Sequence, residues 1–353
     1  MRKLKAKSNK SFGVLKDKSI HPIKATYNLF STNTIEFSDG TIEQATCLNC
    51  LNTPCMNYDQ AELIISLLPE MPNNNTSKVC PTDAIGFDEN IFPTINATAC
   101  IGCGLCIQRC PYGAIEWQEY KAYISKSFSN MYSWVNDLSM EEYQIRHKKY
   151  IDIQNKPALI NLPKEFITKL YNDTINYCKK INGFDNLFVR NLFINLGLRN
   201  KIRAIGNNYI RFDLLAEFDN SIIVGEIGLN NTDILEEPRA ILDDIAILFS
   251  RYNIPKETII PIIITLAFPN KRSDVYEVIT DINNVLSIQI RTIPFHLLVM
   301  MNLFHLRLEP TQFFKLFNID KNNLSSINDS LKIIPELKTI DPYLNHSFYQ
   351  ATK

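Results

Sequence analysis

The stretch Cys100-Ile-Gly-Cys103-Gly-Leu-Cys106-Ile-Gln-Arg-Cys110-Pro111 determines how we expect the first part of this chain to fold. Its cysteines follow the spacing C-x2-C-x2-C-x3-C-P. Three thiolates separated by two residues let one short loop offer three ligands to one iron-sulfur cubane, while the fourth cysteine faces a different cluster. A zinc site usually takes two separated C-x2-C pairs or a Cys/His mixture instead. The spacing therefore favours an iron-sulfur centre over zinc.

A second cysteine group lies upstream and repeats this inventory in a looser form. It reads Cys47-Leu-Asn-Cys50-Leu-Asn-Thr-Pro-Cys55, with four residues between its second and third cysteines, and it has a distant partner in Cys80. Residues 80–85 read C-P-T-D-A-I, and residues 110–115 read C-P-Y-G-A-I. The two groups therefore form an internal duplication.

Residues 47–117 resemble a bacterial-type ferredoxin domain, an α+β fold with two [4Fe-4S] clusters in which each half ends in C-P-x-x-A-I. Because ligation is crossed in that family, the resemblance implies that the first cluster is bound by Cys47, Cys50, Cys55 and Cys110. It implies that the second cluster is bound by Cys100, Cys103, Cys106 and Cys80. The x4 spacing and the insertion from Met56 to Val79 depart from the compact pattern, which bears on loop geometry and reduction potential rather than on ligand number. Gly102 and Gly104 suit the close backbone approach that hydrogen bonds to cluster sulfurs need.

Composition limits the remaining possibilities. Lys and Arg number 37, as do Asp and Glu, so the whole protein is not a polycation that coats nucleic acid. The amino terminus lacks the apolar core of a secretory signal, and the run 259–268 is shorter than the roughly 18 residues of a membrane helix. We therefore expect a cytoplasmic protein without a membrane partner, in which clustered cysteines bind metal rather than form disulfides. The isolated Cys178 is expected to be a packed small side chain.

The chain is expected to divide into five segments. They are a basic flexible tail (1–18), the two-cluster ferredoxin-like domain (19–117), a helical connector (118–165), an α/β domain (166–310) and a carboxy-terminal extension (311–353). The tail carries seven basic residues against one acid, so it is either a solvated tail or an arm that contacts phosphates or an acidic partner.

The α/β domain alternates helical and strand patterns. Residues 209–218 alternate polar and apolar and predict a half-buried strand, which a turn at Asp219-Asn220 joins to a second strand over 221–227. The apolar run 259–266 predicts a strand covered on both faces. Helices are predicted around residues 184–196, 238–252, 273–285 and 295–306, and a further strand over 286–293.

In pattern and topology, residues 184–306 resemble the PD-(D/E)xK nuclease-like fold, a restriction-endonuclease-like mixed sheet flanked by helices. The resemblance implies that Asp213 and Glu226 bind a divalent metal, Mg or Mn, and that Glu217 assists them. Gly228 stands where active members carry a lysine, for which Lys201 is a replacement candidate. Three interpretations stay open: ordinary strand carboxylates, a degenerate domain that binds nucleic acid or protein, and an active nuclease.

Two functions compete at this point. In the first, the clusters are a redox or structural module fused to a nuclease-like domain that binds nucleic acid. In the second, the protein is an electron-transfer subunit whose carboxy-terminal domain docks a partner oxidoreductase or a larger assembly. A third possibility is that the clusters only hold the fold together.

Overall fold

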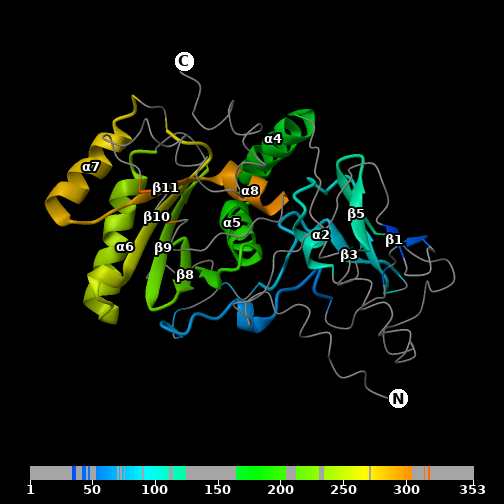
Figure 1. The fold of residues 1–353 in the computed structure, drawn as a ribbon, viewed down its shortest axis with the longest axis horizontal. Helices are drawn as coiled ribbons and strands as arrows, with labels where there is room; N and C mark the ends of the chain where they lie inside the picture. Colours follow the sequence, from blue (N-terminus) through cyan, green and yellow to red (C-terminus); the bar gives the residue numbers. More distant parts are fainter. Residues whose placement is uncertain are drawn as a thin grey trace. The chain divides into compact units, whose positions relative to one another are not determined.

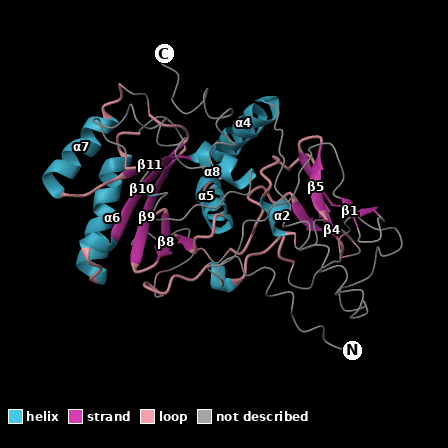
Figure 2. Cartoon of the chain, viewed as in Figure 1, coloured by secondary structure: helices cyan, strands magenta, loops and turns pink. Residues whose placement is uncertain are grey.

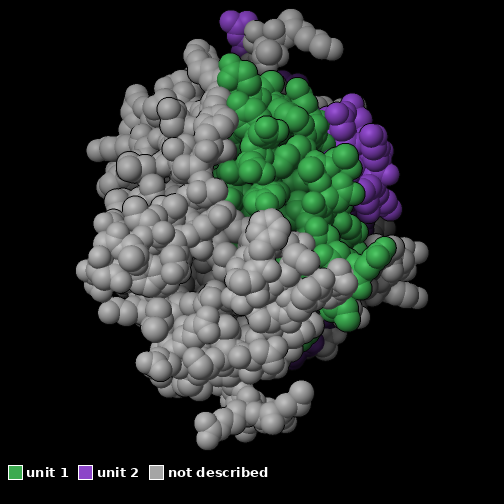
Figure 3. Space-filling model, turned by 90° about the vertical axis from the view of Figure 1, so that its right-hand side faces the viewer, with its two compact units in different colours: residues 1–60, 77–174, 303–305 green, residues 61–76, 175–302, 306–353 purple. Residues whose placement is uncertain are grey.

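The computed structural model forms two compact units, which Figure 3 colours separately. The first unit contains residues 1–60, 77–174 and 303–305, and the second contains residues 61–76, 175–302 and 306–353. The residues that the structure describes are 34–36, 42–44, 47, 53–69, 71, 74, 76–89, 91–110, 114–124, 164–203, 212–229, 234–269, 272–303, 314 and 317–318. The basic tail and the segment 319–353 lie outside them.

Short antiparallel hairpins are the main elements of the first unit (Figures 1 and 2). They pair β1 (Thr34–Glu36) with β2 (Ile42–Gln44), β3 (Ile85–Phe87) with β4 (Pro93–Ile95), and β5 (Ile115–Gln118) with β6 (Lys121–Ile124). The short helix α2 (Leu105–Arg109) carries the end of the second cysteine group. Both β3 and β5 begin at the isoleucine that ends a C-P-x-x-A-I segment, so the duplication extends to secondary structure.

The start of the expected helical connector is a hairpin instead. Strands β5 and β6 are joined by Glu119 and Tyr120, whose φ angles of 49° and 65° are both positive. Two consecutive positive φ angles are typical of the tight turn that matches the twist of a hairpin. Residues 125–163 lie outside the described residues, and α4 (Lys164–Lys180) follows them.

The second unit is a mixed five-stranded sheet with the strand order β11-β10-β9-β8-β7. The strands are β7 (Asn200–Ile202), β8 (Leu214–Phe218), β9 (Ser221–Gly228), β10 (Ile259–Thr265) and β11 (Arg291–Pro294). The first three pair antiparallel and the last three pair parallel. Helices α6 (Glu237–Tyr252) and α7 (Val275–Leu286) lie on one side of the sheet, and α5 (Phe184–Asn195) and α8 (Phe295–Leu303) lie on the other (Figure 1). The predicted mixed sheet flanked by helices is confirmed.

The predicted strand pattern needs three corrections. The strand expected over 209–218 is described only from Leu214, and it is not half-buried, because Leu215 on its second face is also in the core. The strand expected over 286–293 is limited to β11. Strand β7 was not predicted. Helices cover both faces of the sheet, so both faces of β8 are buried. The alternation of polar and apolar residues therefore does not predict one buried and one exposed face here.

Within the part of the chain that the structure describes, no helix combines the length and the apolar character that crossing a membrane requires.

Candidate functional site

The cysteines of the first unit are mostly buried. Seven of the eight predicted ligands are described, and Cys50 lies outside the described residues. Cys55 and the four cysteines from Cys100 to Cys110 are buried, whereas Cys47 and Cys80 are partly exposed. None of the described cysteines is in a disulfide.

The structure brings members of the two cysteine groups together. Burial raises the pKa of Cys55 well above the usual thiol value, and the neighbouring thiols of Cys110 and Cys47 raise it further. Burial is also the largest cause of the raised pKa of Cys103, followed by the neighbouring Cys80. Each of these neighbourhoods joins the upstream group to the downstream group.

Burial also raises the pKa of Cys106, and its neighbours Cys103, Cys100 and Cys80 raise it further. This thiol therefore belongs to the same neighbourhood as Cys103. The thiol of Cys55 also raises the pKa of Cys106, and its contribution is the smallest among these neighbours.

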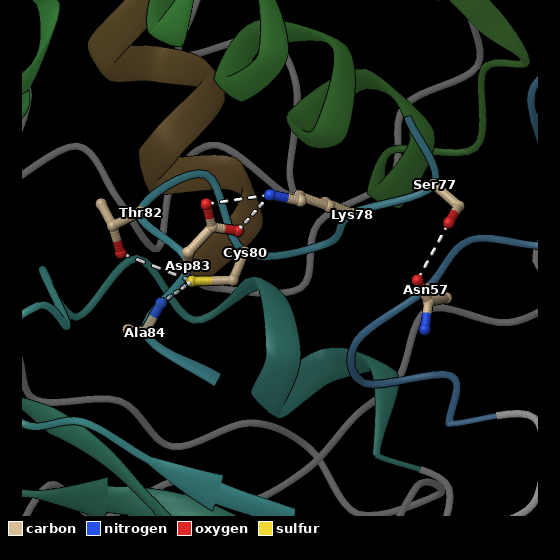
Figure 4. Close-up of polar contacts among 7 residues, drawn as sticks. All are labelled: Asn57, Ser77, Lys78, Cys80, Thr82, Asp83 and Ala84. Carbon is tan, nitrogen blue, oxygen red and sulfur yellow. Dashed lines mark hydrogen bonds and ion pairs between the residues drawn. The ribbon is translucent and has the colours of Figure 1, made fainter. Parts of the chain in front are cut away.

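Backbone amides donate hydrogen bonds to several of the sulfurs. The nitrogen of Ala84 lies 3.2 Å from the Sγ of Cys80, and the nitrogen of Ala114 lies 3.2 Å from the Sγ of Cys110. The nitrogen of Ala122 lies 3.4 Å from the Sγ of Cys100. Figure 4 shows Cys80, whose sulfur is also 3.4 Å from the hydroxyl of Thr82. Amide donors of this kind favour the thiolate and tune the potential of a cluster bound to it.

The chemistry of this donor set fits an iron-sulfur cluster, for which cysteine thiolates are the usual ligands. Among the described residues, no three Cys, His, Asp or Glu side chains converge on a point that would hold one ion. The ligands of a cubane need not converge on one point, because each of its four irons takes a different cysteine. An iron-sulfur core would supply the positive charge that favours the thiolate form of these buried cysteines.

The two glycines of the downstream group allow the backbone to pass an aromatic side chain. Gly102 and Gly104 have φ angles of 75° and 78°, which side chains rarely adopt. A Cβ at Gly102 would collide with the carbonyl oxygen of Tyr120, and a Cβ at Gly104 would lie 3.0 Å from the ring of Trp117. Both glycines are therefore required by the packing of the protein, whatever they contribute to a cluster.

Arg109 is a buried cation beside the cysteines, and the sequence pattern did not reveal it. Only 5% of its surface is exposed. Its Nε donates to the carbonyl oxygen of Pro54 at 2.8 Å, and its guanidinium lies 4.2 Å from the ring centroid of Tyr58. Its charge acts on Cys55 in the direction that lowers the thiol pKa. Arg109 thus provides positive charge beside Cys55, which is expected to bind an iron-sulfur cluster as a negatively charged thiolate.

In the second unit, Asp213 and Glu226 lie together with a third carboxyl group, that of Asp244 on α6. Burial, followed by the hydrogen bond with Asp244 and the charges of neighbouring carboxylates, raises the pKa of Glu226 to about 12. The same hydrogen bond lowers the pKa of Asp244, which burial nonetheless raises to about 6. The pair therefore holds a proton at neutral pH. Asp244 is 1% exposed, and its Oδ2 has no hydrogen-bond partner.

The carboxylate of Asp213 is held by surrounding donors. Its Oδ1 accepts from Asn186 at 3.0 Å and its Oδ2 from the nitrogen of Ile227 at 3.2 Å, while Arg203 lies 3.8 Å away. Burial nevertheless raises its pKa. The three carboxyl groups share hydrogen bonds, and they do not form a metal site as they stand.

No lysine reaches this group from the two positions that the sequence suggested. A Cβ at Gly228 would collide with the carboxylate of Glu237, so this acid occupies the space beside Gly228. The Nζ of Lys201 is buried and donates to the carbonyl oxygens of Leu68 at 2.7 Å and Met71 at 2.8 Å. Lys201 therefore has a structural role.

Glu217 is not brought to Asp213 and Glu226 either. Its Oε2 accepts from the nitrogens of Ser66 and Leu67, and its Oε1 lies 3.7 Å from Arg199. The residues that the sequence analysis missed are Asp244 and Glu237. Asp244 had a signal, because it falls between Ile241 and Ile245 on the apolar face of its helix.

Comparison with known proteins places the first unit's cysteines in a family context. The family model of the LdpA Fe-S cluster-binding domain matches residues 71–121. The B subunit of the anaerobic dimethyl sulfoxide reductase of Escherichia coli is 40% identical over 50 residues, which are 14% of this chain and 24% of that protein. The B subunit of the polysulfide reductase of Wolinella succinogenes is 31% identical over 80 residues, 22% of this chain and 31% of that protein.

An uncharacterised ferredoxin of Methanocaldococcus jannaschii is 32% identical over 85 residues, which are 24% of this chain and 37% of that protein. These matches thus span well under half of each relative. The solved structure of the restriction endonuclease FokI aligns with 50% of this chain and 41% of that chain, at 11% identity and a TM-score of 0.31, which does not establish a shared fold. The chain therefore contains an iron-sulfur cluster-binding domain of the ferredoxin type.

Proposed function

We propose that this protein binds two [4Fe-4S] clusters through crossed ligation and passes electrons to or from a redox partner. The observation that supports this most directly is that Cys55 neighbours Cys110 while Cys103 neighbours Cys80. Each neighbourhood draws on both cysteine groups, as crossed ligation requires. Two of the similar proteins are B subunits of reductases, which favours a role inside a redox assembly.

In this proposal, each bound cluster supplies a one-electron change, and the protein sets how easily that electron is accepted. The ligands of one cluster are Cys47, Cys50, Cys55 and Cys110, and those of the other are Cys100, Cys103, Cys106 and Cys80. The amides of Ala84, Ala114 and Ala122 orient the sulfurs, and burial excludes water from most of them. Arg109 adds positive charge on the side of Cys55.

Pairs of cysteine substitutions test the crossing. The protein is purified anaerobically, its iron and sulfide are counted, and the reduced form is examined by EPR. Cys110→Ser alone is expected to remove one cluster. Cys110→Ser combined with Cys47→Ser is expected to remove no more iron than Cys110→Ser alone, because both residues serve one cluster. Cys110→Ser combined with Cys100→Ser is expected to remove both clusters.

The opposite pattern, in which Cys110 behaves as a partner of Cys100, would show uncrossed ligation. Iron content equal to a single cluster in the unsubstituted protein would overturn the two-cluster proposal. Clusters that are present but cannot be cycled between redox states would exclude electron transfer and leave a structural role.

A second candidate function concerns the second unit, which we call the sheet unit because it contains the five-stranded sheet. We propose that it is a degenerate nuclease-like domain that binds nucleic acid without cutting it. The specific observation is Glu237, whose carboxylate occupies the space beside Gly228 where a catalytic lysine would stand. Burial and the neighbouring carboxyl groups also raise the pKa of Glu226, so a metal ion would have to displace a proton to bind there.

Binding and cleavage are measured separately on the cluster-containing protein. We expect salt-dependent binding of DNA or RNA, and no cleavage with Mg²⁺ or Mn²⁺. Metal-dependent cleavage that Glu226→Gln abolishes would instead show an active site. Absence of salt-dependent binding would remove nucleic acid as the partner. Glu236→Gln, at an exposed carboxylate next to Glu237, is the matched control.

A further inference from the structure

The insertion between Cys55 and Cys80 leaves the first unit and folds with the second. We call residues 61–76 the insertion segment, because they belong to the second unit while residues 60 and 77 belong to the first. Its described residues are 61–69, 71, 74 and 76. The chain therefore passes into the sheet unit and returns before it reaches Cys80.

Apolar side chains anchor the insertion segment in the core of the sheet unit. Ile65, Leu68 and Met71 are 0%, 2% and 4% exposed, and they join the core cluster that contains Leu215 and Ile241. Burial removes these apolar side chains from water and therefore stabilises the docked segment. The segment is therefore part of the sheet unit's core rather than a surface loop.

Buried polar side chains of the sheet unit also bind the backbone of the segment. Lys201, only 4% exposed, donates to the carbonyl oxygens of Leu68 and Met71. Arg190, fully buried, donates to the carbonyl oxygen of Thr76 at 2.6 Å. A buried carbonyl oxygen that loses its charged donor is left without that hydrogen bond, which destabilises the structure. These contacts make undocking of the segment unfavourable for the sheet unit.

Two further contacts join the segment to the outermost strand β7 and to its neighbour β8. The nitrogen of Asn74 donates to the carbonyl oxygen of Ile202 at 3.2 Å, so the segment pairs with the outermost strand β7. The carboxylate of Glu217 accepts from the nitrogens of Ser66 and Leu67. The segment thus covers part of an edge that would otherwise be open to another strand.

The two ends of the insertion are held together inside the first unit. Asn57 and Lys78 form an antiparallel bridge, and the nitrogen of Tyr58 donates to the carbonyl oxygen of Ser77 at 2.7 Å. The hydroxyl of Ser77 donates to Oδ1 of Asn57 at 2.9 Å (Figure 4). We call this pairing the neck. One of the two chain segments that form the neck leads back to Cys55, and the other leads on to Cys80.

We infer that the insertion segment couples cluster occupancy to the stability of the sheet unit. This inference rests on the proposed two-cluster function, in which Cys55 and Cys80 bind different clusters. With both clusters bound, the two ends of the neck are fixed, and the segment is presented to the sheet unit with little loss of chain entropy. Without them, the neck is free to separate, and docking must also offset the entropy lost in ordering the chain.

Hydrogen-deuterium exchange of the full-length protein tests the coupling. Iron and sulfide are counted first, and the protein is then compared with the same preparation depleted of iron by an anaerobic chelator. We expect exchange in residues 61–69 and in β7 to become about tenfold faster after depletion. The centre of β10, on the other side of β9, serves as the internal reference and is expected to change less.

Two variants separate docking from cluster binding. Lys201→Met removes the donor to the segment, and Asn74→Pro removes the backbone N–H that donates to Ile202 together with the side-chain oxygen that accepts from the nitrogen of Thr76. Both are expected to speed exchange in the segment while iron and sulfide content stay unchanged. Equal exchange of residues 61–69 with and without iron would overturn the coupling even when two clusters are counted. A count below two clusters would instead overturn the proposed function.

Discussion

The backbone nitrogen of Ala84 donates a hydrogen bond to the Sγ of Cys80 at 3.2 Å. The same bond, at the same length, joins Ala114 to Cys110 in the second half of the duplication. Each bond spans the C-P-x-x-A segment, and a strand begins at the next residue in both halves. The repeated letters therefore specify a repeated way of holding one sulfur.

Gly102→Ala is expected to destabilise the first unit and to lower its iron content. The residue has a φ angle of 75°, and an added Cβ would collide with the carbonyl oxygen of Tyr120. Strain and displacement of this kind cost about 1–3 kcal/mol or more. Thermal unfolding and iron analysis measure both effects. Gly86→Ala is the matched control, because no atom lies within 4 Å of its added Cβ. Equal behaviour of the two variants would contradict the assigned packing role.

Arg109→Gln is expected to make the reduction potential of the cluster bound by Cys55 more negative. A buried positive charge favours the form that carries the extra electron, and removing it disfavours reduction. Arg109→Lys keeps the charge and should retain most of the original potential. An EPR-monitored redox titration separates the variants. An unchanged potential in Arg109→Gln would show that this cation acts only through its bond to Pro54 and its contact with Tyr58.

His296 is expected to make the sheet unit sensitive to acid. Burial lowers its pKa from 6.5 to about 4, so the folded protein binds fewer protons than the unfolded chain between these values. The stabilisation is therefore complete above pH 6.5 and is lost as the pH falls towards 4. Between pH 7 and 5.5 the loss is on the order of 1 kcal/mol.

Thermal unfolding of the protein and of His296→Gln at several pH values measures this effect. The unsubstituted protein should lose more stability than the variant as the pH is lowered from 7 to 5.5. Parallel pH profiles would mean that other groups cause the acid sensitivity.

Cys178 is expected to resist alkylation in the folded protein. Burial, together with the nearby charge of Asp185, raises its pKa to about 12. Because the thiolate is the reactive species, iodoacetamide at pH 8 should label Cys178 at least tenfold more slowly than an unfolded control. Mass spectrometry of the labelled peptide measures the rate. Rapid labelling would contradict the packing role that the sequence suggested.

The sequence predicted most elements of the sheet unit because their signals are local. Strand β9 and helix α6 follow from a turn at Asp219-Asn220 and from a proline in the first helical turn. The cysteine spacing likewise predicted the iron-sulfur domain, which the comparisons support. The details of ligation stay predictions, because Cys50 lies outside the described residues.

Other features depend on residues that are distant in sequence. The role of Lys201 follows from two carbonyl oxygens in a segment that reads as an irregular insertion. The space beside Gly228 is filled by Glu237, and nothing in the letters E-I-G indicates this. Glu217 was expected beside Asp213, but its carboxylate accepts a hydrogen bond from the nitrogen of Ser66 instead. The alternation of residues along a strand predicts which face of the sheet a side chain lies on, but it does not predict which residue that side chain contacts. Long-range packing decides each of these cases.

The insertion segment also has a consequence for biosynthesis. Leu68 and the lysine that binds it are separated by 133 residues in the chain. A ribosome that adds about 5–20 residues per second needs on the order of ten seconds to cross this distance. All eight predicted cluster ligands are translated before the strand that receives the segment. During this interval the segment is present without the strand that it docks on, so it gains its partners only after the whole cysteine-bearing region has been synthesised.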